Sequence, residues 1–398
     1  MNKTSWTLMC ALHLPLLCFA RSALTNSFFN DSQLYEGSPC QLRHGAGEGI
    51  CVKAVNCPGV LAQIQKEGYR HICKCGFTNF DEIICCTKSA SQTKDRMRPA
   101  DTACEKYKKM VLELDIEPSF TTVVFNGVLA KVDEFPHMVA LGYAASDDED
   151  GAIRGIKYVC GGTLISLKHV ITAAHCVSNV HGLVPIEVLL GTIDLTNPNS
   201  NSMQRIPISR VIKHPQYGRG LHYNDVAILE LKKKAKISAS VQPTCLMTKP
   251  SSSLTAMEKP RLTILGWGAI NLEGTTSTKL LKAEGLRFVE KNECSKKYIN
   301  SRGLPNGLDD GMICVVDADI TRKADTCWGD SGGPLLISPS KFSPLAGITS
   351  FGQACGGTTP GVYASVYNYL NWIEDQVCYS IDMRFDLESL QCRSASYT

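Results

Sequence analysis

Three residues of this chain have the types needed for nucleophilic hydrolysis: His175 in VITAAHCV, Asp225 in HYNDVAILEL and Ser331 in DTCWGDSGGPLL. A serine hydroxyl is a weak nucleophile that needs a base; an imidazole can be that base, and a carboxylate can orient the imidazole. Taken singly, a histidine is more often a core or surface residue, and an aspartate before a strand is more often a cap or turn residue. Their joint occurrence in the order His, Asp, Ser reverses that expectation and predicts a catalytic triad.

The glycines beside Ser331 indicate how such a centre would hold negative charge. Gly329 lets the backbone turn tightly, so that its N–H group and that of Ser331 can converge on one point. Two converging donors stabilise a developing oxyanion. We therefore expect these two amides to form an oxyanion hole.

The elements that must position these residues are short strands. From about residue 124, β-branched runs such as YVCGGTLIS, HVITAAHC and DVAILEL alternate with glycine, proline and asparagine turns. This pattern predicts an all-β barrel or sandwich. Near the end of the chain, Val366, Leu370, Ile373 and Val377 recur at helical spacing and predict a helix packed on the barrel.

The start and the composition of the chain indicate a secreted protein. The formal net charge of the 398 residues is +3, which gives no indication of nucleic acid or a membrane surface as a partner. Lys3 and the short apolar run LMCALHLPLLCFA predict a signal peptide over residues 1–20, with cleavage as late as residue 23. A buried N-terminal helix is the alternative. The sequon at Asn30 is compatible with glycosylation.

Nineteen cysteines in such a chain indicate disulfides rather than free thiols. Removal of Cys10 and Cys18 with the signal peptide leaves an odd number, so at least one cysteine should be free or bonded to another chain. Seven cysteines crowd residues 40–86, a segment too short to bury much core, so bridges must hold it. A zinc site is the alternative, but the spacings lack a repeated C-x2-C pattern. The polar, basic segment that follows is interpreted as a linker.

The segments TAAHC, NDVAIL and GDSGGP closely resemble those of the chymotrypsin/trypsin family of serine proteases, and the resemblance covers residues 124 to about 377. It implies two antiparallel six-stranded β-barrels with a C-terminal helix. It also implies that His175 takes the proton of Ser331 while Asp225 orients and stabilises the imidazolium. No cofactor is implied. Because Thr192 stands where trypsins carry a calcium-binding glutamate, no metal is expected.

The same resemblance implies a substrate preference. Asp325 lies where trypsin-like members keep the carboxylate of the primary pocket, and such a buried charge selects lysine or arginine. Gly352 and Gly361 stand where side chains would otherwise block that pocket. Two residues depart from the pattern: Phe351 replaces the usual tryptophan on the pocket wall, and Trp328 replaces the usual glutamine at its mouth.

The N-terminal cysteine-rich segment resembles an arthropod clip domain, because CGFTNFDEIICC ends in the Cys-Cys pair of that family. Clip-domain proteases of the snake-like and easter-like group combine such a module with a trypsin-like domain. Cys73 is extra to the pattern and is the candidate for the odd thiol, while Cys378 and Cys392 are expected to pair with each other. The two resemblances imply seven further disulfides: Cys40–Cys85, Cys51–Cys75, Cys57–Cys86, Cys104–Cys245, Cys160–Cys176, Cys294–Cys314 and Cys327–Cys355.

Activation in the family frees an amino terminus that inserts beside the aspartate preceding the nucleophile, here Asp330. Alignment with that segment places the cut between Val123 and Val124. No lysine or arginine lies between Lys109 and Lys131, so the activating protease should not be tryptic. The expected domains are a clip domain at 40–86, a linker and activation region at 87–123, a protease domain at 124–378 and a C-terminal extension at 379–398.

Together these features predict a secreted serine endopeptidase zymogen that acts in an extracellular cascade of arthropod immunity, melanisation or development. Its expected partners are a protein substrate (a downstream zymogen or pro-ligand), an upstream protease of non-tryptic specificity and a serpin-type inhibitor. The clip module would serve partner recruitment. A catalytically inactive clip-domain cofactor and a venom protease are the alternatives; the three triad residues favour the enzyme over the first of these.

Overall fold

The computed structural model describes two units of the chain, Met1–Arg96 and Met97–Thr398, each considered by itself. Among the described residues, no helix is long and apolar enough to cross a membrane. The predicted signal peptide, Asn30 and the Val123–Val124 bond lie outside the described residues. The structure describes residues 38–42, 48–54, 57, 60, 72–77, 82–87, 98–113, 128–145, 155–178, 180, 182–197, 202–218, 220–250, 261–269, 275–317, 330–338, 342–352 and 359–379.

The N-terminal unit contains a four-stranded antiparallel sheet in the order β1-β2-β4-β3. Its buried core consists largely of cysteines, with Ile83 packed among them. Three predicted disulfides are present here, Cys40–Cys85, Cys51–Cys75 and Cys57–Cys86. The strands are β1 (Pro39–Gln41), β2 (Glu48–Lys53), β3 (Lys74–Phe77) and β4 (Glu82–Thr87).

Cys73 corrects one expectation, because it is disulfide-bonded rather than a free thiol. It lies next to β3 and is buried in the same small core as the other cysteines. A sheet with so few apolar side chains depends on covalent links for its stability, and an additional bridge serves that purpose.

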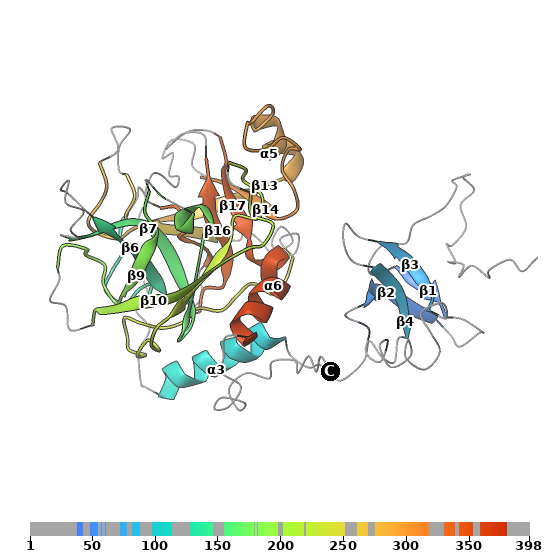
Figure 1. The fold of residues 1–398 in the computed structure, drawn as a ribbon, viewed down its shortest axis with the longest axis horizontal. Helices are drawn as coiled ribbons and strands as arrows, with labels where there is room; N and C mark the ends of the chain where they lie inside the picture. Colours follow the sequence, from blue (N-terminus) through green and yellow to red (C-terminus); the bar gives the residue numbers. More distant parts are fainter. Residues whose placement is uncertain are drawn as a thin grey trace, which may run out of the picture. The chain divides into compact units, whose positions relative to one another are not determined.

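The first barrel of the second unit is closed by six antiparallel strands in the order β10-β11-β8-β7-β6-β9 (Figure 1). Strand β8 is buried along its whole length, as expected for the β-branched run that precedes His175. The strands are β6 (Met138–Ala145), β7 (Gly155–Ser166), β8 (His169–Thr172), β9 (Pro185–Leu190), β10 (Gln204–Lys213) and β11 (Ala227–Leu231).

The second barrel is also six-stranded, since pairing of β12 with β13 closes the run β12-β15-β16-β17-β14-β13. A short seventh strand, β5 (Val128–Leu129), pairs with β13. These findings confirm the two six-stranded barrels. The strands are β12 (Arg261–Gly266), β13 (Leu281–Val289), β14 (Met312–Asp317), β15 (Pro334–Ser338), β16 (Leu345–Phe351) and β17 (Gly361–Ser365).

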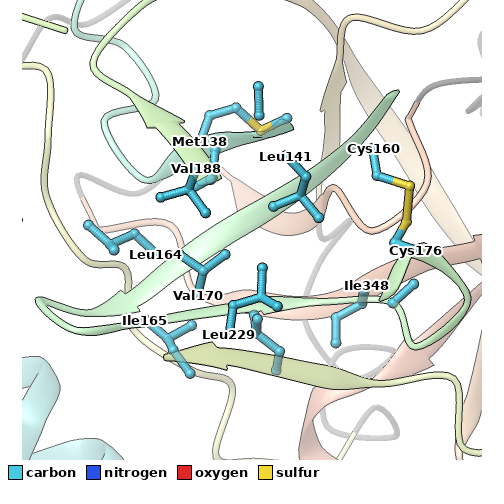
Figure 2. Packing of buried hydrophobic residues seen from close by; sticks show 14 of the residues in the cluster. Met138, Leu141, Cys160, Leu164, Ile165, Val170, Cys176, Val188, Leu229 and Ile348 are labelled. Atoms are coloured by element: carbon cyan, nitrogen blue, oxygen red, sulfur yellow. A yellow bond between two sulfur atoms is a disulfide. The ribbon is translucent and has the colours of Figure 1, made fainter. Parts of the chain in front are cut away.

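One hydrophobic cluster fills the first barrel and continues into the boundary with the second. Figure 2 shows Leu141, Val170 and Leu229 of the first barrel packed near Ile348 of β16. Because protein interiors are close-packed, this shared core fixes the two barrels relative to each other. Residues on loops at the boundary are thereby held in defined positions.

Helices cover part of the second unit. Helix α6 (Val366–Tyr379) confirms the predicted C-terminal helix: Val366, Leu370 and Ile373 are buried on its inner face. A short helix, α5 (Lys291–Lys297), carries Cys294. The expected linker and activation region at 87–123 also contains a helix, α3 (Pro99–Glu113), and this helix belongs to the second unit.

Candidate active site

His175 begins a one-turn 3₁₀ helix, η4 (His175–Val177), directly after the buried residues Ala173 and Ala174. Two links fix this turn. The Cys160–Cys176 disulfide joins it to β7, and the hydroxyl of Tyr143 on β6 donates to the carbonyl of Cys176 at 2.8 Å. The imidazole is therefore attached to a rigid part of the first barrel, with about a third of its side chain exposed.

Asp225 lies one residue before the buried Val226 that leads into β11, and only 3% of the residue is exposed. One of its carboxylate oxygens, Oδ1, accepts a hydrogen bond from the backbone N–H of His175 at 2.9 Å. The other, Oδ2, lies 2.8 Å from His175 Nδ1 and also accepts the hydroxyl of Ser350, at 2.5 Å. Both oxygens of this buried carboxylate are thus satisfied, as a buried charge requires.

The two groups stabilise each other's charged forms. Burial disfavours the imidazolium, but the attraction of Asp225 and its hydrogen bond outweigh that effect, and the pKa of His175 is raised above its ordinary value. Burial likewise opposes ionisation of Asp225, but the charge of His175 and the hydrogen bonds from His175 and Ser350 hold the pKa of this carboxyl below its ordinary value. The arrangement suits a base that must accept a proton during a reaction.

The backbone around Ser331 is fixed by both barrels. The N–H of Gly161 on β7 donates to the carbonyl of Ser331 at 2.8 Å, and the N–H of Gly332 donates to the carbonyl of Thr349 on β16 at 2.9 Å. Gly332 has a φ of 76°, and a Cβ there would collide with Thr172. Only glycine fits this turn without strain, which explains one glycine of the GDSGGP segment.

Asp330 points its carboxylate at a glycine-lined surface. Its Oδ1 accepts the backbone N–H of Gly268 at 2.9 Å, and a Cβ on Gly266 or Gly268 would overlap the carboxylate. The carboxylate can come this close to the loop after β12 because both residues are glycines.

Comparison with known proteins identifies the catalytic unit. The sequence pattern of the family described as Trypsin matches residues 124–373. This chain belongs to the trypsin family. In keeping with that membership, a solved structure of neuropsin, a serine protease expressed in the limbic system of mouse brain, covers 64% of this chain and 100% of its own, with a TM-score of 0.50 and 28% identity.

Relatives of trypsin-family membership extend the similarity to most of the chain. Serine protease snk of Drosophila melanogaster is 32% identical over 359 residues, which make up 86% of this chain and 79% of that protein. CLIP domain-containing serine protease C9 of Anopheles gambiae is 28% identical and covers 88% of both chains. Proclotting enzyme of Tachypleus tridentatus is 31% identical, covering 83% of this chain and 88% of its own. The family resemblance stated from the sequence is thereby confirmed.

The trypsin-family pocket is described in part. Gly361 begins β17 and is buried, while Gly352 follows β16, is exposed, and has no atom within 4 Å of the position a Cβ would take. Phe351 stacks on His222, with ring centroids 4.0 Å apart, and meets the ring of Tyr298 edge-on. Asp325, Trp328 and Gly329 lie outside the described residues and remain predictions, as does the Cys327–Cys355 pair.

Three more predicted disulfides are present in the trypsin-family unit: Cys104–Cys245, Cys160–Cys176 and Cys294–Cys314. Two groups of described residues have ligand atoms close enough together for a metal, Cys40/Cys51/Cys75 and Cys160/His175/Cys176. The cysteines of both groups are disulfide-bonded, so they offer no thiolate to an ion.

Sequence reasoning missed two residues at this site. Ser350, 125 residues later in the chain, donates a hydrogen bond to Asp225, and the ring of His222 stacks on Phe351. A serine in GITSFG carries no signal of its own, because its role depends on the register of β16. His222 had a weak signal, since it lies three residues before Asp225 in a segment already recognised.

Proposed function

We propose that the protein is a secreted serine endopeptidase zymogen that cleaves after arginine or lysine in an extracellular cascade of limited proteolysis. One observation carries the proposal: the carboxylate of Asp225 is bound by His175 from one barrel and by Ser350 from the other. A purely structural carboxylate would not require an imidazole that keeps a third of its side chain exposed.

The reaction is acyl transfer to Ser331. His175 Nε2 takes the hydroxyl proton of Ser331 as Oγ attacks the substrate carbonyl, and Asp225 stabilises the imidazolium that forms. The N–H groups of Gly329 and Ser331 bind the oxyanion. His175 then returns the proton to the leaving amine, and water releases the acyl group by the same steps in reverse order.

Substrate preference follows from the residues proposed for the primary pocket. Asp325 supplies the carboxylate, and a neutral side chain would leave that buried charge unpaired. Gly361 and Gly352 leave the entrance free of side chains, and Phe351 provides an apolar wall. These residues together favour a long cationic side chain.

Activation is proposed to occur at Val123–Val124. The new ammonium would pair with Asp330, whose carboxylate already meets the N–H of Gly268. Pairing would position the Gly329 amide of the proposed oxyanion hole beside Ser331, whose carbonyl is already bound by Gly161. Because the cut follows valine, the enzyme cannot activate itself, and its activator prefers small aliphatic residues.

The cascade role rests on the relatives and on the N-terminal module. Proclotting enzyme and Phenoloxidase-activating enzyme, the latter from Bombyx mori, have names that refer to a clotting enzyme and to the activation of phenoloxidase. We propose that this chain likewise acts on a protein substrate, with the module at 40–86 recruiting partners, and that a serpin-type inhibitor limits it. The signal peptide at 1–20, the activation region at 87–123, the protease domain at 124–378 and the extension at 379–398 complete the proposed organisation.

The test uses the activated full-length protein and a panel of peptide substrates. Peptides ending in arginine or lysine should be cut at least about a hundredfold faster than those ending in valine or phenylalanine. Ser331→Ala should lower kcat by a factor on the order of 10⁶, so that no cleavage is detected. Retained cleavage in Ser331→Ala would refute the enzyme proposal, and N-terminal sequencing that finds a terminus other than Val124 would refute the activation site.

A further inference from the structure

Helix α3 lies against helix α6 of the catalytic domain (Figure 1), although it precedes the proposed activation site in the sequence. We propose that α3 is a docking helix: after the cut it stays bound, by non-covalent contacts, in a groove formed by α6, the end of β7 and residues 244–248. This inference rests on the proposed cut, which separates α3 from the catalytic chain. The N-terminal chain is then retained by a protein interface in addition to Cys104–Cys245.

Glu374 of α6 makes the central polar contacts between α3 and this groove. Its two carboxylate oxygens accept Arg98 Nε at 3.3 Å and Arg98 Nη2 at 2.9 Å, a two-point pairing. Oε1 also accepts the backbone N–H of Ala100 at 3.1 Å, in the first turn of α3. A carboxylate at a helix N-terminus satisfies a donor that the helix itself cannot and interacts favourably with the helix dipole.

Further polar contacts fix the angle of the helix. Arg98 Nη2 donates to Asn371 Oδ1 at 2.6 Å, and Thr248 Oγ1 donates to Asp101 Oδ1 at 2.9 Å. The first turn of α3 is thus held from two separate parts of the catalytic domain, α6 and the segment after Cys245. A disulfide at Cys104 alone would demand none of these contacts.

The apolar face of α3 continues the dock beyond the first turn. Ala100, Tyr107 and Val111 are buried, and their spacing places them on one side of the helix. A cavity of about 30 Å³ lies under this face, lined in part by Tyr107, Ile165 and Ile373. An isolated helix of 15 residues is marginal in water, so α3 owes its stability to this packing.

The opposite side of the helix supplies a control. Glu105 pairs with Lys108 of the same helix at 2.7 Å, and the Glu105 side chain is 58% exposed. Glu105 therefore offers the same charge as Glu374 on the same structural unit, without contact with the groove. Exposed pairs of this kind contribute little to stability.

The experiment uses the full chain with Ser331→Ala, Cys104→Ser and Cys245→Ser, and with the recognition site of a sequence-specific protease inserted after residue 118. Cleavage there does not depend on the native activation site or on this enzyme's activity. We expect the two chains to co-elute on native size-exclusion chromatography at micromolar concentration. Separate elution of two folded chains would overturn the proposal.

A comparison of two single substitutions tests whether the groove residues hold α3. In the same background, Glu374→Ala should weaken association of the cleaved chains at least about tenfold, whereas Glu105→Ala should leave it unchanged within about twofold. Exchange of the partners, Arg98→Glu with Glu374→Arg, should recover part of the loss. Equal effects of Glu374→Ala and Glu105→Ala would overturn the assigned site. A failure of the proposed protease function would not change either result, because the readout is association.

Discussion

The two barrels have the same number of strands, and His137 and His169 of the first are accommodated in the opposite way to Lys282 of the second. The first barrel holds His137 and His169, and burial lowers the pKa of each to about 4, so both are neutral. The second holds Lys282, which is 6% exposed and charged, in contact with Glu134 and Glu284. Burial therefore requires either loss of the charge or a partner for it, and one protein uses both solutions.

The barrels also make different contributions to the catalytic site. The first provides His175, Asp225 and a backbone donor to Ser331, while the second provides Ser350 and the acceptor for Gly332. Asp225 is the residue on which both contributions meet. The boundary between the barrels is therefore sensitive to changes in either one.

The largest expected effect comes from the first barrel's contribution. Asp225→Asn removes the charge that stabilises the imidazolium and should lower kcat about 10⁴-fold. Because Asp225 raises the pKa of His175, the acid limb of kcat/KM in the unmodified enzyme should have its midpoint above 6.5, and activity should fall as the pH drops through it. Steady-state kinetics from pH 5 to 9 measure both. A loss smaller than tenfold in Asp225→Asn would mean that the boundary carboxylate is not catalytic.

The second barrel can be tested through Lys282. Lys282→Met leaves Glu134 and Glu284 without the cation that neutralises them, which should cost about 3–5 kcal/mol of unfolding free energy. Denaturant unfolding at pH 7 measures this cost, with Lys291→Met as the control, because Lys291 pairs with Asp310 at the surface. Equal destabilisation by the two variants would show that the buried contacts of Lys282 contribute no more to stability than the surface pair of Lys291.

The first barrel should be sensitive to acid. The unfolded chain protonates histidine near pH 6.5, whereas His137 and His169 resist protonation until about pH 4 in the folded state. The contribution of these two histidines to the free energy of unfolding is therefore complete above pH 6.5. It declines as the pH falls toward 4, by about 3 kcal/mol for each histidine. Thermal unfolding across this range measures the decline. His137→Phe removes one of the two titrating groups and should reduce the dependence of stability on pH. Because Nε2 of His137 has no hydrogen-bond partner among the described residues, the substitution breaks no hydrogen bond of that atom. An unchanged pH dependence would contradict the low pKa assigned to His137.

The smallest effect is expected where the second barrel supports the first. Ser350→Ala removes one hydrogen bond from Asp225 and leaves its contact with His175 in place. Roughly a tenfold loss of kcat should follow, since a hydrogen bond to a charged group contributes about 1.5 kcal/mol. Kinetics on the same peptide as for Asp225→Asn allow direct comparison. A loss of kcat as large as that of Asp225→Asn would contradict this ranking and show that Ser350 matters as much as the charge of Asp225.

Local patterns predicted the parts of the molecule that depend on local chemistry. The alternation of strand and turn signals predicted an all-β fold, and the spacing of Val366, Leu370 and Ile373 predicted α6. The pairing of His175 with Asp225 was expected because both lie in long, specific motifs. In each case the informative residues lie close together within a single motif or segment of the sequence.

Cys104–Cys245 was expected across 141 residues, but three other features that depend on distant contacts were not predicted. The interpretation of α3 as a linker gave weight to its polar surface and missed the spacing of Ala100, Tyr107 and Val111, which matters only once a groove is available. Lys282 looks like a surface residue until β13 pairs with β5 and brings Glu134 beside it. Cys73 was counted as unpaired because sequence alone cannot give disulfide connectivity.

Strand β5 also limits how far an activated terminus can move. The strand begins at Val128, where it pairs with Lys282, so a cut before Val124 leaves residues 124–127 ahead of it. Four extended residues reach at most about 14 Å, and one ammonium confined within that radius has an effective concentration on the order of 0.1 M. Capture of this ammonium by a carboxylate within reach would then be intramolecular, so dilution of the protein would not weaken it.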